Sequence, residues 1–172
     1  MMELTNFLGK GIAQTKEAIP LWESLVSSHR PARIIELGTG GGMFSCYLKL
    51  LCIQFDAEFH TFDNHPLTET SVSHLLDLRS SFEMLDIFVN EEKIAGLIKR
   101  DGLTIMFCDD GDKIREFNMF TKYLKTGDII SAHDWGVEIS NQDVVESLID
   151  LSYLPLNEFL EVAAYTKFFI KL

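Results

Sequence analysis

The sequence predicts a single α/β domain, residues 1–172, in which helices cover both faces of a mostly parallel sheet. Short apolar runs alternate with stretches of helical periodicity along the chain, which is the pattern of such folds. The run at 103–108 is almost entirely apolar, as expected of a central strand that is buried on both faces. Several of these runs end in acidic residues. No internal repeat or linker divides the 172 residues, so we expect one domain that includes an N-terminal helical leader over 1–30.

Each element is predicted by its own apolar pattern. We expect parallel strands at 33–37, 58–62, 82–87, 103–108 and 129–132. A helix is expected after each of them, at 43–53, 70–78, 91–99, 114–124 and 144–149. A first helix is expected at 15–27, although Pro20 interrupts its pattern. The last two apolar runs, 158–162 and 167–171, are expected to pair as an antiparallel hairpin on the sheet edge.

Composition limits the function classes. Fifteen basic residues stand against 26 acidic ones, for a net charge of −11, which argues against a nucleic-acid partner and favours a small neutral or cationic compound. No apolar run reaches the roughly 18–20 residues of a membrane span. The N-terminus lacks the pattern of a signal peptide, and the three cysteines have no metal-ligand spacing. We therefore expect a cytoplasmic protein with reduced thiols and no membrane partner.

The most informative segment is 34–42, which reads Ile-Ile-Glu-Leu-Gly-Thr-Gly-Gly-Gly. An apolar strand runs into a glycine-rich turn, and a helical pattern starts at Met43. Such a turn lets the backbone approach a ligand closely, and the helix N-terminus offers unpaired N–H groups. The spacing differs from the dinucleotide fingerprint G-x-G-x-x-G, because Met43 stands where the third glycine would be. The segment predicts a nucleoside-ligand site, with an ordinary tight turn as the alternative.

Acids stand at or near the ends of four predicted strands: Glu36, Asp63, the pair Asp109 and Asp110, and Asp134. Ligands of open α/β sheets bind outside the carboxyl ends of the strands. An acid at position 63 suits the two hydroxyls of a ribose, with a helix N-cap as the alternative.

The segment 107–113, Phe-Cys-Asp-Asp-Gly-Asp-Lys, is the second candidate site. Two adjacent acids after a buried strand need a cation, hydrogen-bond donors or water. Carboxylate oxygens suit Mg²⁺ or Ca²⁺, and Asp134 can add another oxygen, whereas a nitrogen from His133 would suit a transition metal better. The alternative is an acidic loop that caps the helix after it. A phosphohydrolase with a His-Asp metal pair fits poorly, because the other histidines are scattered along the chain.

The spacing E-x-G-x-G-x-G at 36–42 resembles motif I of the class I methyltransferases, which use S-adenosylmethionine. With the leader Gly-Lys-Gly-Ile-Ala-Gln at 9–14 and the two acidic turns, the chain resembles the cephalosporin hydroxylase and rhamnosyl O-methyltransferase group over nearly its whole length. Asp110, Lys113 and Asp134 also match the Mg²⁺-binding catechol O-methyltransferase type. That type continues with Asn where this chain has Trp135, so His133 is the candidate replacement ligand.

The resemblance implies a Rossmann-like class I methyltransferase fold with a seven-stranded, mostly parallel sheet and an antiparallel C-terminal hairpin. It implies S-adenosylmethionine as cofactor, and Mg²⁺ as a further one. Asp63 would hold the ribose, and Asp86 or its neighbour would meet the adenine, unless Asp86 is simply a solvent-facing strand residue. The implied cofactor residues are Glu36, Gly38, Thr39, Gly40, Gly41, Asp63, Asp86 and Asp109. The implied metal ligands are Asp110 and Asp134, with Asp109 the alternative to Asp110, and the base is Lys113 or His133.

Three functions stay open at this point. The first is metal-assisted O-methylation of a hydroxyl on a small-molecule acceptor. The second is a metal-independent N-methyltransferase, and the third is a non-enzymatic S-adenosylmethionine-binding protein. An NAD-dependent dehydrogenase is disfavoured by Met43. Many relatives self-associate, so the resemblance is compatible with a homo-oligomer. The aromatic residues near the C-terminus, Tyr165, Phe168 and Phe169, are expected in the core, with an interface as the alternative.

Overall fold

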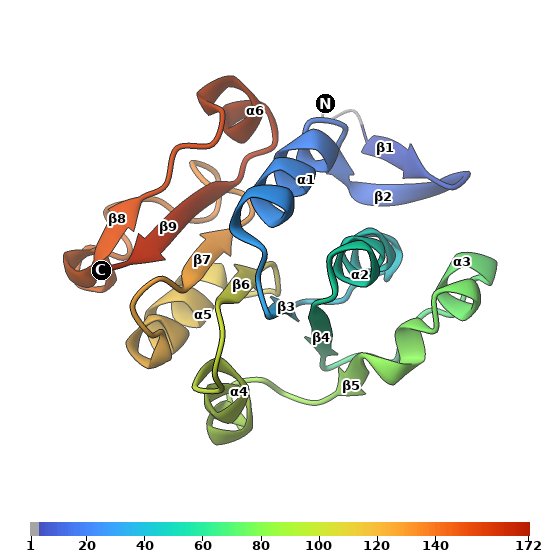
Figure 1. Ribbon diagram of the computed structural model, residues 1–172, viewed down its shortest axis with the longest axis horizontal. Coiled ribbons are helices and arrows are strands. Elements are labelled where there is room, and N and C mark those ends of the chain that lie inside the picture. Colours follow the sequence, from blue (N-terminus) through green and yellow to red (C-terminus); the bar gives the residue numbers. More distant parts are fainter. Residues whose placement is uncertain (1–3) are drawn as a thin grey trace.

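A computed structural model describes residues 4–172, and its centre is a seven-stranded sheet in the order β5-β4-β3-β6-β7-β9-β8 (Figure 1). The strands of this sheet are β3 (Arg33–Leu37), β4 (Glu58–Asp63), β5 (Phe82–Met84), β6 (Thr104–Cys108), β7 (Ile129–Ala132), β8 (Leu151–Tyr153) and β9 (Lys167–Lys171). The first five are parallel, and β9 is antiparallel to both β7 and β8. The predicted Rossmann-like fold with an antiparallel C-terminal strand pair is confirmed.

Helices cover both faces of the sheet, as predicted (Figure 1). On one face lie α1 (Ala18–His29) and α2 (Met43–Phe55), and on the other lie α4 (Glu91–Ile98) and α5 (Lys113–Phe120). The remaining short helices are α3 (Ser71–Leu75), η1 (Leu78–Ser80), η2 (Thr121–Tyr123), η3 (Ser147–Asp150) and α6 (Glu158–Ala163). None of the helices within residues 4–172 combines the length and apolar character needed to cross a membrane.

The alternating side chains of the parallel strands divide the core into two layers. Ile34 packs with the apolar residues of α1 and α2, whereas its neighbour Ile35 packs with those of α4 and α5. Every residue of β3, β6 and β7 is buried. These three central strands therefore form a rigid platform, and the loops at their carboxyl ends meet at one edge of the sheet.

The predicted helical leader is only partly helical, which corrects that prediction. Its first three residues lie outside the described residues. Two strands, β1 (Leu4–Phe7) and β2 (Lys10–Thr15), form a separate antiparallel sheet before α1 begins. Ile12 and Gln14 are both buried at intervals of two, which is a strand pattern. The helix starts at Ala18, so Pro20 falls in its first turn, where a missing N–H costs no hydrogen bond.

The C-terminal hairpin has a different first strand from the predicted one. Residues 158–162 lie in helix α6, and Leu151–Tyr153 is the strand that pairs with β9. The side chain of Asn157 accepts a hydrogen bond from the Leu160 N–H, and the Glu161 carboxylate accepts one from the Leu156 N–H. These local caps favour a helix over the strand that apolar content alone suggested.

Three further elements are shorter than predicted. The expected helix at 144–149 is replaced by turns and the single 3₁₀ turn η3. Only Val144 and Leu148 contact the core, whereas Val145 and Ile149 are mostly exposed. The strand at 82–87 ends at Met84, and the helix at 70–78 is split into α3 and η1. None of these three changes moves the edge of the sheet where the predicted site lies.

Candidate active site

A cavity of about 340 Å³ lies at the carboxyl ends of β3, β6 and β7. Six residues predicted to bind a cofactor line it, namely Glu36, Gly38, Thr39, Gly40, Gly41 and Asp109. Residues of the β1–β2 hairpin close another side of the cavity, and Phe44 of α2 also lines it. The cavity therefore brings together the glycine-rich turn, the acidic turn after β6 and a part of the leader that the sequence did not place there.

Within the glycine-rich turn, Gly38 and Gly41 meet different constraints. Gly38 has a φ of +95°, and a Cβ built on it would lie 2.4 Å from the carbonyl oxygen of Asp109. Its missing side chain is thus required by contact between two turns of the protein itself. By contrast, a Cβ on Gly41 would meet no atom within 4 Å. Open space at Gly41 leaves the backbone accessible to a ligand in the cavity.

A buried network of hydroxyl groups connects Glu36 to the glycine-rich turn. Its Oε2 accepts hydrogen bonds from Ser45 Oγ at 2.5 Å and from Thr61 Oγ1 at 2.6 Å. Thr39 Oγ1 lies 2.7 Å from Thr61 Oγ1 and joins the network. Burial raises the pKa of the Glu36 carboxyl to about 8. Burial therefore favours the neutral form of Glu36, which links β3 to α2 and β4.

Asp63, at the end of β4, is directed at the glycine-rich turn. Its Oδ2 accepts a hydrogen bond from the backbone N–H of Gly40 at 2.8 Å, and its Oδ1 accepts one from the His65 N–H at 2.8 Å. The carboxylate thus fixes the turn and retains further lone pairs for a ligand hydroxyl. Asp86 is exposed, and its Oδ1 accepts from the N–H groups of Phe88 and Val89. It caps a turn and is not among the residues that line the cavity.

Asp109, His133 and Asp134 form a compact group in which one potential ligand atom from each lies within 4.8 Å of the others. His133 Nδ1 lies 3.1 Å from Asp109 Oδ1 and 3.4 Å from Asp134 Oδ2. Asp110 lies outside this group, although the resemblance favoured it over Asp109 as a metal ligand. The side chains of successive residues point in different directions, and that of Asp109 points toward His133 at the end of β7.

Lys113 supplies the positive charge beside this acidic group. Its Nζ lies 3.3 Å from Asp134 Oδ2, 3.8 Å from Asp109 Oδ1 and 2.8 Å from Glu138 Oε2. Burial by itself lowers the pKa of Lys113, but the hydrogen bond to Glu138 and the neighbouring carboxylates outweigh it and raise the pKa overall. A raised pKa keeps the ammonium protonated, which disfavours Lys113 as a base and leaves His133 as the stronger candidate.

Gln14 belongs to the site although sequence reasoning assigned it no role. Its Nε2 donates a hydrogen bond to Asp109 Oδ2 at 2.9 Å, across 95 residues of sequence. Its Oε1 is buried and has no partner among the described residues, and the same holds for His133 Nε2. Both residues line the cavity. Two orphaned polar atoms at one cavity indicate a polar ligand. The leader pattern at 9–14 was the signal that could have found Gln14.

The donor set fits a divalent cation. Two carboxylates and an imidazole suit Mn²⁺ or a similar transition metal at least as well as Mg²⁺, which prefers oxygen ligands. Burial raises the pKa of Asp109, and the hydrogen bond to His133 together with the nearby Lys113 offsets only part of that rise. Lys113 offsets only part of the charge of Asp109 and Asp134.

No family model and no curated protein matches this sequence. Among solved structures, CmcI with SAH is similar, with a TM-score of 0.68 and 12% identity over 97% of this chain and 81% of that one. CmcI with Mg-SAM gives a TM-score of 0.66 and 14% identity, covering 98% and 76%. A SAM-dependent O-methyltransferase from Thermotoga maritima gives 0.57 and 13%, covering 92% and 66%. The chain therefore has the fold of the class I methyltransferases.

Proposed function

We propose that this protein is an S-adenosylmethionine-dependent methyltransferase that methylates a hydroxyl group of a small molecule. The observation that carries the proposal is the hydrogen bond from the Gly40 N–H to Asp63, which joins the glycine-rich turn to an acid at the end of the next strand. Solved structures with the same fold are described with SAH and with Mg-SAM. The cavity beside this turn is also lined by Asp109, His133 and Asp134.

The cofactor would be held by the turn and by Asp63. Gly41 gives open backbone, and the free lone pairs of Asp63 suit the two ribose hydroxyls. The buried, unpartnered Oε1 of Gln14 suits a cationic donor such as an ammonium group at the methionine end. When bound, S-adenosylmethionine supplies an electrophilic methyl group, which a nucleophile attacks in line with the bond to sulfur.

Asp109, Asp134 and His133 would hold a divalent cation, which when bound lowers the pKa of an acceptor hydroxyl and anchors it. Within this proposal Asp109 takes the ligand role that the resemblance gave to Asp110. Gln14 fixes Asp109 through its hydrogen bond, and Lys113 fixes Asp134 through its ion pair. Both partners act as positioning residues that hold the two carboxylates in one orientation.

A second candidate is a metal-independent methyltransferase. It is favoured by the hydrogen bond between His133 Nδ1 and Asp109, which leaves the buried Nε2 without a partner. A carboxylate that holds one ring nitrogen orients the other as a base, so His133 Nε2 would remove the proton of the acceptor. Lys113 already pairs with both carboxylates, which supports this alternative.

Calorimetric titration with S-adenosylhomocysteine, with and without Mn²⁺ or Mg²⁺, tests the cofactor site. We expect binding to wild type, and affinity at least about tenfold weaker in Asp63→Ala, equivalent to about 1.4 kcal/mol. Asp86→Ala is the matched control, because Asp86 is also an acid after a strand but caps an exposed turn. The control should bind as wild type does.

Absence of any binding of S-adenosylhomocysteine or S-adenosylmethionine would refute the proposal. Methyl transfer from labelled S-adenosylmethionine to hydroxyl compounds is then compared with and without a chelator. Turnover that persists with a chelator and is lost in His133→Gln would favour the metal-independent candidate. Turnover that requires the added cation would favour the metal-assisted one.

A further inference from the structure

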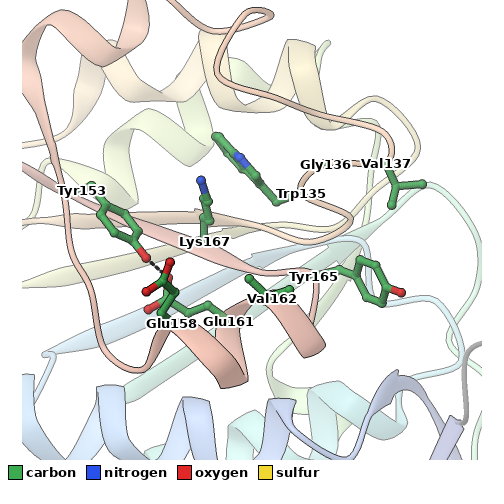
Figure 2. Close-up of a pocket in the computed structure, with 9 residues that line it drawn as sticks. All are labelled: Trp135, Gly136, Val137, Tyr153, Glu158, Glu161, Val162, Tyr165 and Lys167. Atoms are coloured by element: carbon green, nitrogen blue, oxygen red, sulfur yellow. Dashed lines mark hydrogen bonds between the residues drawn. The ribbon is translucent and has the colours of Figure 1, made fainter.

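A second cavity, of about 300 Å³, lies beside the candidate active site between the loop after β7 and helix α6 (Figure 2). Its walls include three aromatic side chains, Trp135, Tyr153 and Tyr165, together with Val162 and Lys167. Val162 is 69% exposed, so the cavity is open to solvent at this side. Such a mixture of aromatic walls and a single cationic group is typical of a site for a small organic molecule.

The cavity adjoins the acidic group through two links. Trp135 follows Asp134 directly, and its backbone N–H donates a hydrogen bond to the carbonyl oxygen of Tyr165 at 2.8 Å. Lys167 is paired with Ala132 across β7 and β9, and Ala132 is the residue before His133. Lys167 therefore stands at the same edge of the sheet as His133 and Asp134. A molecule in this cavity would lie next to the residues proposed to activate an acceptor.

Lys167 is the cationic residue of the cavity lining. Its Nζ lies 5.6 Å from the ring centroid of Trp135 and 5.5 Å from that of Tyr153. Among the described residues, no carboxylate lies within ion-pairing distance of this half-buried ammonium. Figure 2 shows the ammonium near the two rings and directed away from the acids on α6. The rings stabilise the cation but leave room for an anion.

The two glutamates that line the cavity have other partners or face solvent. Glu161 is buried, and it accepts hydrogen bonds from the Tyr153 hydroxyl at 2.7 Å and from the Leu156 N–H at 2.8 Å. Glu158 is exposed in the first turn of α6, where a negative charge is favoured. A cationic ligand would have to displace Lys167 from between the rings. The charge balance at the rings therefore favours an anionic ligand.

We propose that this cavity binds the methyl acceptor, and that the acceptor is an aromatic hydroxy compound whose carboxylate pairs with Lys167. The inference rests on the proposed function for the identity of the reaction, but the binding preference stands on the cavity alone. Trp135 and Tyr153 supply flat apolar surfaces for an aromatic ring. The strongly negative chain would thus select an anion through one local charge, whereas net charge alone favoured a neutral or cationic compound.

The test compares three probes that share one ring: para-hydroxybenzoate, its neutral methyl ester and para-hydroxybenzylamine. The chain has two tryptophans, and Trp22 is buried in the core, so the indole N–H resonance of Trp135 reports on the cavity while that of Trp22 serves as an internal reference. Titrations followed by these two signals need neither S-adenosylmethionine nor a metal. We expect para-hydroxybenzoate to bind about tenfold more tightly than the ester, as for a hydrogen bond to a charged group.

Variants at Lys167 separate the charge from the shape of the cavity. Lys167→Met should remove the preference for the benzoate, and Lys167→Arg should keep it. Lys171→Met is the matched control on the same strand, because Lys171 pairs with Asp150 and lines no part of the cavity. The proposal is overturned by equal binding of benzoate and ester, by tighter binding of the amine, or by no shift with any probe.

The outcome of these titrations does not depend on the outcome of the cofactor calorimetry, so the two proposals can fail separately. A benzoate preference that depends on Lys167, with no binding of S-adenosylhomocysteine, would refute the methyltransferase proposal and leave an anion-selective cavity. Binding of S-adenosylhomocysteine without a benzoate preference would refute the acceptor class and leave the methyltransferase proposal intact. Methylation of para-hydroxybenzoate, slowed in Lys167→Met through KM more than through kcat, would support both the methyltransferase proposal and the acceptor proposal.

Discussion

Gln14 donates a hydrogen bond to Asp109 at 2.9 Å, so a residue of the N-terminal hairpin orients the acid that follows the central strand β6. The bond joins β2 to the acidic group and closes one side of the cavity. Because burial and the neighbouring Asp134 raise the pKa of Asp109, a donor to its second oxygen stabilises the ionised form. The hairpin is therefore part of the site.

Replacing Gln14 with Leu should cost about 1–3 kcal/mol in the free energy of unfolding, because Asp109 Oδ2 would be left buried without its donor. Urea denaturation measures the change. Gln54→Leu is the matched control, since Gln54 is exposed on α2, and it should change stability by less than about 0.5 kcal/mol. Equal stability of Gln14→Leu and wild type would show that the hydrogen bond contributes nothing.

Gly38→Ala and Gly41→Ala should differ in their effect on stability. A Cβ at Gly38 would lie 2.4 Å from the Asp109 carbonyl oxygen, so we expect a loss of more than about 3 kcal/mol in stability or failure to fold. A Cβ at Gly41 meets nothing within 4 Å, so the melting temperature should stay as in wild type. If the cofactor binds at this turn, Gly41→Ala should still weaken S-adenosylhomocysteine binding. Unchanged affinity would place the ligand elsewhere.

Asp109 and Asp110 make a matched pair for the metal proposal. Asp109→Asn should weaken Mn²⁺ binding at least about tenfold, because one of three ligands becomes neutral. Asp110→Asn should leave it nearly unchanged, since Asp110 lies outside the group formed with His133 and Asp134. The signal of free Mn²⁺ in electron paramagnetic resonance measures both affinities. A larger loss in Asp110→Asn would restore the assignment that the family resemblance favoured.

Lys113→Met should tighten Mn²⁺ binding. The ammonium of Lys113 pairs with Asp134 at 3.3 Å, so it competes with a cation for the same carboxylate. Removing the positive charge should increase affinity at least about threefold, because solvent screens a buried ammonium only weakly. Lys122→Met is a control, because Lys122 pairs with Glu91 on the outer surface of the molecule. Weaker binding in Lys113→Met would show that the positioning of Asp134 by Lys113 outweighs its competition with the cation.

Stability should fall with rising pH because of Glu116, which is fully buried. Burial raises its pKa from 4.5 to about 8 in the folded protein. The unfolded chain releases this proton near 4.5, so between these values the folded state binds more protons and the free energy of unfolding decreases as pH rises. Between about pH 5 and pH 8, the free energy of unfolding of Glu116→Gln should decrease by at least about 1 kcal/mol less than that of wild type. Glu92→Gln, at an exposed site, should follow wild type.

The sequence determined the central parallel strands and the position of the site. Alternation and apolar content define β3, β4, β6 and β7, because buried parallel strands leave a strong local pattern. Glycine spacing after β3 and acids after three other strands located the cavity, since the carboxyl ends of parallel strands meet at one edge. These signals depend only on neighbours in sequence.

The tertiary structure decided which of the adjacent acids joins the site and which distant residues complete it. The spacing to Lys113 favoured Asp110, but Asp109 is the acid that lies within reach of both His133 and Asp134. Gln14 and Lys167 reach the site region from opposite ends of the chain, through β2 and through pairing of β9 with β7. The short C-terminal segment became a helix because its caps outweigh its apolar pattern. Contacts between residues so far apart in sequence arise from packing, which no local pattern encodes.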